Sequence, residues 1–156
     1  MPQTSKKFVL TSTGLENLRK EHAALTNVER PAVIERIQIA REFGDLAENS
    51  EYDAAKEDQS LLETRIIQLE EILKSAEIID ERQDVDFVVI GSTVVVEMND
   101  EEHEFTIVGS VEADPVQRKI SNESPVGKAL LGLKKSEIIE IGVGPVRTKI
   151  KVLEIK

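Results

Sequence analysis

The stretch Phe43-Gly44-Asp45-Leu46-Ala47-Glu48-Asn49-Ser50-Glu51-Tyr52 separates two long helical patterns and decides how they fold. Gly44 can end the first helix, because a residue without a Cβ adopts positive φ without a steric clash. Asp45 and Asn49 are both residue types that favour the N-cap of a following helix. A short turn between two helices predicts an antiparallel hairpin, with these residues at its far end.

Apolar residues on both sides of the turn repeat at spacings of three and four, which is the heptad pattern of a coiled coil. The first helix carries Leu15, Leu18, His22 and Leu25, followed in a new phase by Val33, Ile37 and Ala40. The second helix carries Tyr52, Ala55, Gln59, Leu62, Ile66, Leu69, Leu73 and Ala76. Pro31 lacks a backbone donor, so we expect a kink or local unwinding there. Thr13, with Glu16 three residues later, predicts a capping box at the first helix start.

After the polar run at 79–84 the apolar period changes from about 3.5 to 2. β-Branched runs predict strands at 87–90, 93–98, 104–108, 137–143 and 147–155. Between them, Ser124 as N-cap, Pro125 as the first helical residue and Gly132 as the stop predict a short helix. The predicted fold class is α+β. An antiparallel helical hairpin forms residues 1–79, with no strand before Asp80, and an antiparallel sheet domain with a short helix forms residues 80–156.

Composition limits the possible functions. The 156 residues carry a net charge of −10, from 30 acidic and 20 basic residues, which argues against non-specific binding to duplex nucleic acid. There is no cysteine, so no disulfide or thiolate chemistry is expected, and a cytoplasmic location fits. No segment approaches the roughly 20 apolar residues that span a bilayer, and residues 1–7 do not begin a secretory signal. We expect a monomer that does not bind membranes.

Asp45 and Glu48 lie three residues apart at a helix start, so their carboxylates can converge. Two carboxylates hold a hard divalent cation weakly, with waters and a second surface supplying the other ligands. The same carboxylates also complement the positive end of a helix. On spacing alone, this second explanation is favoured.

The run Gly44-Asp45-Leu46-Ala47-Glu48-Asn49-Ser50-Glu51-Tyr52-Asp53-Ala54-Ala55-Lys56 closely resembles the signature of the Gre family of bacterial transcript cleavage (elongation) factors. Upstream, Arg30-Pro31 and Ala40-Arg41-Glu42 resemble the family's first helix. Downstream, residues 120–132 resemble its C-terminal motif, Ile-Ser-Asn-Glu-Ser-Pro-Val-Gly-Lys-Ala-Leu-Leu-Gly. Two separated motifs in the right order make the resemblance specific, and it covers almost the whole chain. It implies an FKBP-like fold for residues 80–156.

The resemblance also implies a function. Such factors bind bacterial RNA polymerase, with the globular domain at the rim of the secondary channel and the helical arm, here about 45 Å long, inside it. They stimulate the polymerase's own cleavage of backtracked nascent RNA and are not enzymes by themselves. Asp45 and Glu48 match the family's tip acids. These help to hold a second Mg²⁺ and a water, and the free protein is not expected to bind the metal tightly.

Further residues follow from the same resemblance. Tyr52 matches the family's tip tyrosine and is equally well explained as the first seam residue of the second helix. Glu123, Ser124 and Pro125 match the loop that docks on the polymerase rim, and they can cap the short helix at the same time.

Three basic residues near the turn are candidates for contacts to the RNA 3′ end: Arg36, Arg41 and Lys56. For any one of them, pairing with the neighbouring acids Glu35, Glu42 and Glu57 is the favoured explanation.

Two other functions compete with cleavage stimulation. A Gre-like paralogue occupies the same channel and inhibits the polymerase without promoting cleavage, but the retained Asp45 and Glu48 argue against this alternative. A coiled-coil adaptor without chemistry explains the heptads and leaves the acidic turn unexplained.

Overall fold

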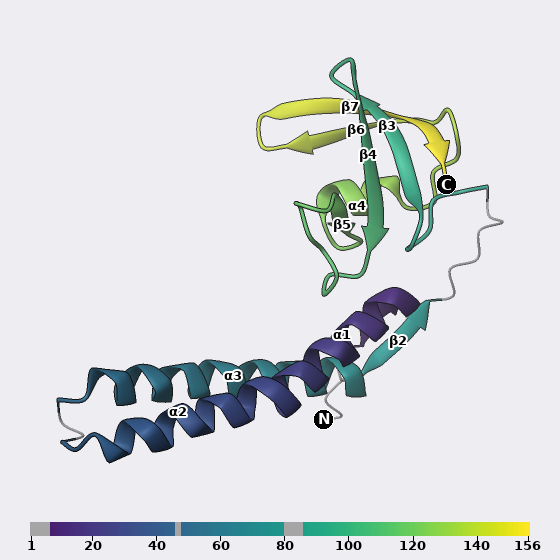
Figure 1. Cartoon of the computed structure of the whole chain (residues 1–156). Helices are drawn as coiled ribbons and strands as arrows, with labels where there is room; N and C mark the ends of the chain where they lie inside the picture. Colours follow the sequence, from purple (N-terminus) through teal and green to yellow (C-terminus); the bar gives the residue numbers. More distant parts are fainter. Residues whose placement is uncertain (1–6, 46–47, 80–85) are drawn as a thin grey trace, which may run out of the picture. The chain divides into compact units, whose positions relative to one another are not determined.

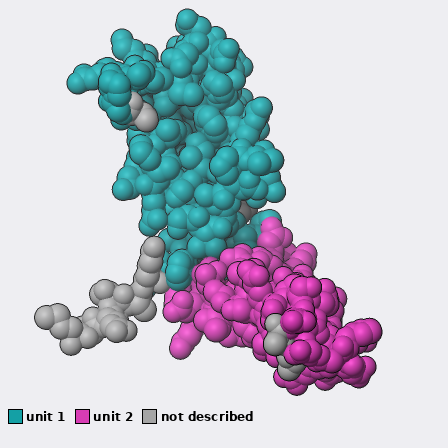
Figure 2. Space-filling view, turned by 90° about the vertical axis from the view of Figure 1, so that its left-hand side faces the viewer, with its two compact units in different colours: residues 1–15, 76–156 teal, residues 16–75 magenta. Residues whose placement is uncertain are grey.

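The computed structural model of the chain describes residues 7–45, 48–79 and 86–156. They form two compact units, one from Glu16–Ser75 and the other from Met1–Leu15 together with Ala76–Lys156 (Figure 2). This division differs from the predicted one at residue 79, because the two ends of the first segment belong with the C-terminal residues. None of the helices in the described ranges is long and apolar enough to cross a bilayer.

The unit Glu16–Ser75 is built on a helical hairpin. Helix α1 (Ser12–Ala24) leads through the π-helical turn η1 (Leu25–Glu29) into α2 (Arg30–Glu42), and α3 (Ser50–Lys74) returns beside α2 (Figure 1). The predicted antiparallel hairpin is therefore confirmed. Its buried seam residues are Leu18, Ile37, Ala40, Ala55, Leu62, Ile66, Leu69 and Ile72.

The end of the seam on α3 differs from the prediction. Ile72 is buried and Leu73 is half-buried, so the seam advances by three residues after Leu69 rather than by four. A straight helix drifts relative to a strict heptad, and a spacing of three in place of four moves the apolar stripe around the helix surface.

The predicted irregularity near Pro31 is confirmed as the turn η1. The N–H of Arg30 donates to the carbonyl of Leu25, five residues earlier, in place of the usual i−4 acceptor. Pro31 has no N–H to continue the regular ladder, so the backbone bonds rearrange directly before it.

Ion pairs cross the hairpin and flank the seam. Arg30 donates from Nε and Nη2 to the two carboxylate oxygens of Glu63, at 2.8 and 2.9 Å. Arg65 binds Glu21 in the same two-bonded way, at 2.7 and 3.0 Å. A bidentate pair requires one relative position of its two helices, so these pairs favour a single register.

The prediction that no strand precedes Asp80 is wrong. Strand β1 (Phe8–Thr11) pairs in parallel with β2 (Ala76–Ile79), with Phe8 opposite Ala76 and Thr11 opposite Ile79. Both runs lie beyond the ends of the helical seam. Pairing as two strands satisfies the backbone N–H and C=O groups of both runs. A short helix here would have no packing partner and would be only marginally stable.

The start of α1 is capped by Thr11, and not by Thr13 as predicted. The Oγ1 of Thr11 accepts from the N–H of Gly14, at 3.0 Å. The carboxylate of Glu112 accepts from the N–H and the hydroxyl of Thr11, at 2.9 and 2.6 Å. Glu112 therefore supplies, from 101 residues away, the bond that a capping-box glutamate supplies locally.

The C-terminal residues form a five-stranded sheet in the order β5-β4-β3-β7-β6. Its strands are β3 (Thr93–Met98), β4 (Glu101–Val108), β5 (Lys119–Ser121), β6 (Ile138–Val143) and β7 (Val146–Ile155). All pairs are antiparallel except β4–β5, which is parallel and which the sequence analysis does not predict. With the short helix α4 (Pro125–Leu130), the predicted α+β class is confirmed.

Residues 87–90 do not form the predicted strand. Phe87 makes an isolated bridge to Lys134, and the N–H of Val88 donates to the carbonyl of Leu133 at 2.8 Å. The run is apolar because Val88 belongs to the buried core of this domain, whose other buried members are Val94, Val96, Ile107, Leu130, Ile141, Ile150 and Val152. Burial alone therefore accounts for a composition that resembles that of a strand.

A comparison of Leu62→Ala with Leu61→Ala tests which face of α3 forms the seam. We expect Leu62→Ala to lower the free energy of unfolding by about 2–4 kcal/mol, through lost burial and a residual cavity. Leu61→Ala is the control, because Leu61 is 65% exposed. Helix melting followed by circular dichroism measures both, and equal losses in the two variants would contradict the seam.

The Arg30–Glu63 pair predicts a pH dependence of stability. The pKa of Glu63 is lowered from its usual 4.5, chiefly because Arg30 donates hydrogen bonds to the carboxylate. A carboxyl with a lowered pKa stabilises the folded state above about pH 4.5, and this contribution is lost as the pH falls through the folded pKa.

Urea unfolding of the original protein and of Glu63→Gln measures this contribution. We expect a more stable original protein at pH 7 and a difference that shrinks at pH 3. A difference that stays constant across this range would show that the ion pair does not contribute through its charge.

Candidate functional site

The turn between α2 and α3 is opened by Gly44. Helix α2 ends at Glu42, and Phe43 follows with φ −79°. Gly44 has a φ of +111°, and its N–H donates to the carbonyl of Arg41 at 3.4 Å. No atom lies within 4 Å of a Cβ built on Gly44, so the backbone conformation, and not lack of space, favours glycine here.

Asn49 closes the turn and joins the two helices. Its Oδ1 accepts from the N–H of Tyr52 at 3.1 Å, which makes it the N-cap of α3. Its Nδ2 donates to the carbonyl of Ala40 in the last turn of α2, at 2.6 Å. One side chain thus satisfies an unpaired donor of α3 and a carbonyl near the end of α2.

Asp45 and Glu48 are both exposed. The N–H of Glu48 donates to the carbonyl of Asp45 at 3.4 Å, so the backbone brings the two residues close at the tip. Because Asn49 caps α3, neither carboxylate is needed as its N-cap. Leu46 and Ala47, between them, lie outside the described residues.

The tip offers oxygen ligands but not a complete metal site. Within the described ranges no group of three or more His, Cys, Asp or Glu side chains converges in a way that could hold a metal ion. Carboxylate oxygens are the ligands that Mg²⁺ prefers, and it commonly takes only one or two of them from a protein. Asp45 and Glu48 therefore fit a metal whose remaining ligands come from elsewhere.

Tyr52 lies at the start of α3 and is half-buried. The guanidinium carbon of Arg41 lies 6.0 Å from the centre of its ring. This distance permits a weak cation–π contact. The position of Tyr52 fits both predicted explanations, as the first seam residue of the second helix and as the tip tyrosine.

The other basic candidates are engaged within the hairpin. Arg36 donates to Asp58 at 2.7 Å and to Glu51 at 3.0 Å, and these hydrogen bonds raise the pKa of its guanidinium. It therefore pairs across the hairpin with α3 and not with its neighbour Glu35. The Nζ of Lys56 donates to Gln59 at 2.8 Å.

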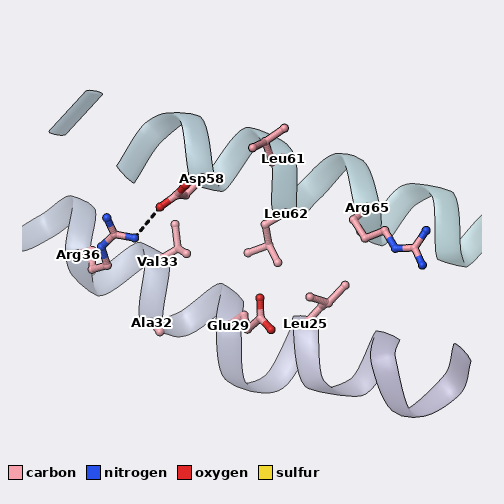
Figure 3. Close-up of a pocket in the computed structure, with 9 residues that line it drawn as sticks. All are labelled: Leu25, Glu29, Ala32, Val33, Arg36, Asp58, Leu61, Leu62 and Arg65. Atoms are coloured by element: carbon pink, nitrogen blue, oxygen red, sulfur yellow. Dashed lines mark hydrogen bonds and ion pairs between the residues drawn. The ribbon is translucent and has the colours of Figure 1, made fainter. Parts of the chain in front are cut away.

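A shallow groove runs between the two helices further along the hairpin (Figure 3). Its polar margin includes the Arg36–Asp58 pair and Arg65, and both arginines are bound to carboxylates. The full lining is Leu25, Glu29, Ala32, Val33, Arg36, Asp58, Leu61, Leu62 and Arg65. This set has no nucleophile or metal-ligating cluster, so the tip remains the candidate for chemistry.

The loop before α4 presents two of the three predicted docking residues. Glu123 and Pro125 are exposed. Ser124 is the N-cap of α4, as predicted. Its Oγ accepts from the N–H of Gly127 at 3.0 Å and donates to the carbonyl of Ser121 at 2.7 Å.

Two features of the tip are missed by the sequence analysis. One is the bond from Asn49 to Ala40, which depends on how closely the helices approach. The other is Phe43, whose side chain is 83% exposed. The available signal for Phe43 is its place directly before the turn glycine, outside the heptad spacing of the first helix.

Comparisons with known proteins match the chain in two consecutive segments. Residues 8–78 match the family "Transcription elongation factor, N-terminal", and residues 82–156 match "Transcription elongation factor, GreA/GreB, C-term". Among curated proteins, the transcription elongation factor GreA of Acetivibrio thermocellus is 54% identical over 156 residues, covering 98% of each chain. The GreA of Clostridium kluyveri is 50% identical over 154 residues, covering 97% of each.

Among solved structures, one titled "Structure of the transcription factor Gfh1" aligns with 28% identity and a TM-score of 0.49, covering 97% of this chain and 99% of that one. The family assignment depends on the two sequence matches and on the identity to the relatives. With both segments matched and about half of all residues shared with these relatives over nearly their full length, the chain belongs to the GreA/GreB family of transcription elongation factors.

Proposed function

We propose that this protein enters the secondary channel of bacterial RNA polymerase and stimulates the polymerase's cleavage of backtracked nascent RNA. The observation that supports this most directly is the exposure of Asp45 and Glu48 at the end of a two-helix hairpin. Membership of the GreA/GreB family and the identity to GreA proteins indicate that RNA polymerase is the partner. A factor that works in this channel acts in the cytoplasm, as one copy per polymerase.

The tip carboxylates would share a Mg²⁺ with the polymerase. Mg²⁺ bound there would activate a water and neutralise charge that develops on the phosphate. Asp45 and Glu48 contribute negative charge and oxygen ligands at an exposed position that another protein's active site can enclose. The chain itself acts as an accessory factor, because an exposed turn neither excludes water nor encloses a substrate.

The hairpin suits a task that requires reach and rigidity. Helix α3 has 25 residues, which corresponds to a length of about 37 Å. The buried seam and the bidentate pairs of Arg30 and Arg65 hold α2 and the preceding residues against it. The bonds of Asn49 then join the start of α3 to the last turn of α2, next in the chain to Glu48.

The loop before α4 is the proposed docking surface on the polymerase rim. Glu123 and Pro125 are free to contact a partner, since both side chains are exposed. Ser124 contributes indirectly. Its hydroxyl bonds to Ser121 and Gly127, and these two hydrogen bonds stabilise the conformation of the loop and the start of α4. Among the basic residues near the tip, Arg41 is the best placed for a phosphate contact, as Arg36 is held by two carboxylates.

Inhibition of the polymerase without cleavage remains the competing function. It requires only occupation of the channel, for which the hairpin suffices. Asp45 and Glu48 argue against it, because both acids that match the family's tip are retained in this chain and exposed.

Asp45→Asn and Glu48→Gln test the role of the tip. We expect the double variant to lose stimulated RNA cleavage in backtracked elongation complexes and to keep polymerase binding. An amide retains the shape but brings no negative charge to Mg²⁺. Cleavage at increasing Mg²⁺ and binding to the polymerase are measured separately.

Asn49→Ala is the matched control for this experiment. We expect it to lower the free energy of unfolding by about 1 kcal/mol through loss of the N-cap, whereas Asp45→Asn leaves stability nearly unchanged. Full cleavage by the double variant would refute the proposal. RNA hydrolysis by the purified protein without polymerase would refute the accessory role.

Glu123→Ala and Pro125→Ala test the docking surface. We expect both to weaken polymerase binding with little change in thermal stability, and a higher protein concentration to restore cleavage because the tip is intact. Ser124→Ala separates the two roles of the loop, since loss of this N-cap should reduce stability by about 1 kcal/mol. Unchanged affinity in both exposed-residue variants would remove the loop from the interface.

A further inference from the structure

Phe43 is an aromatic side chain placed in water at the end of the hairpin. The chain has only four phenylalanines and one tyrosine. Phe43 is 83% exposed, whereas Phe87 is 42% exposed and the other three are half-buried. Exposing a phenyl ring forfeits the stabilisation that its burial would provide. Single exposed apolar residues are common, so the argument depends on where this one lies.

The fold gives the ring of Phe43 no packing role. The last seam positions at this end of the hairpin are Ala40, which is buried, and Tyr52, which is half-buried. The backbone of Phe43 caps α2, with its N–H donating to the carbonyl of Ala40 at 3.4 Å. That bond does not depend on the side chain, so a polar residue would serve the turn equally well.

Phe43 lies close in the chain to the tip acid Asp45. Only Gly44 separates Phe43 from Asp45 in the chain, and all three residues are exposed. Arg41, two residues earlier, is also exposed, and its guanidinium lies over the ring of Tyr52. A flat apolar surface and a cation therefore lie within four residues of a tip carboxylate in the chain.

We propose that Phe43 stacks on an unpaired base of the extruded RNA and so positions the segment to be cut. This inference rests on the proposed function. Every nucleobase has a π-face, and stacking on an aromatic side chain is a sequence-tolerant way to hold single-stranded RNA. Arg41 can approach the phosphate of the same or the next nucleotide, since it has no carboxylate partner among the described residues.

The surroundings of Phe43 favour RNA over an apolar pocket of the polymerase. The exposed side chains within two residues of Phe43 are charged, namely those of Arg41, Glu42 and Asp45. An apolar protein pocket deep enough to bury the ring would also desolvate these charges, which is costly. A stacked base covers the face of the ring and leaves the charged neighbours in water.

The experiment combines variants of the ring with an RNA that lacks the base. Backtracked elongation complexes are assembled with a complete RNA, or with an abasic nucleotide at each extruded position in turn. Cleavage is measured below saturation with the original protein, Phe43→Leu and Phe43→Trp. Each rate is divided by the rate of the same complex without the factor.

We expect Phe43→Leu to reduce stimulation about tenfold on complete RNA, because it keeps an apolar side chain but removes the stacking surface. Phe43→Trp should retain stimulation. At one abasic position the original protein and Phe43→Leu should become equal. Ile67→Ala is the control, since Ile67 is 60% exposed on α3 but about 25 Å along the helix from its start, and it should behave as the original protein does.

Two outcomes would overturn the inference. If Phe43→Leu has no effect on complete RNA, the ring does not contribute. If it reduces stimulation equally on complete RNA and at every abasic position, the ring contacts the polymerase instead of a base. Failure of the proposed function is distinguishable from both, because the original protein would then stimulate no cleavage on any RNA.

Discussion

The apolar seam between α2 and α3 is the interaction on which the hairpin depends. A two-helix hairpin buries one stripe of each helix, so a few residues such as Ile37, Ala40 and Leu62 provide most of the burial. The bidentate pairs of Arg30 and Arg65 flank this stripe and favour one register. Without the seam, the exposed turn would have no defined position from which to present its carboxylates.

At the tip, structural and proposed functional roles fall on different residues. Asn49 caps α3 and binds the carbonyl of Ala40, so the turn is held by an amide that carries no charge. Gly44 supplies the positive φ. Asp45 and Glu48 are both exposed, and neither is the N-cap of α3. The same division appears before α4, where Ser124 holds the loop and its two neighbours face solvent.

The hairpin and its turn were largely predictable because they depend on local chemistry. Heptad spacing identifies the seam, a proline marks the turn η1, and a glycine followed by acceptor side chains marks the bend. The end of the seam at Ile72 was less predictable, since a spacing of three or four is decided by how the helices approach. The choice of Asn49 over Asp45 as N-cap was likewise open, because both side chains can accept the same bond.

The sequence by itself determined the two-helix hairpin, the acidic turn, most strands of the sheet and the capped helix α4, because spacing and capping act over a few residues. Tertiary structure decided the rest. Three features join residues that are separated in the chain. They are the parallel pairing of β1 with β2, the pairing of the edge strand β5 with β4, and the hydrogen bonds from Thr11 to Glu112. Whether Arg36 binds its helical neighbour or α3 was also a tertiary outcome. Such choices depend on which distant groups come within hydrogen-bond distance, and no local pattern encodes that distance.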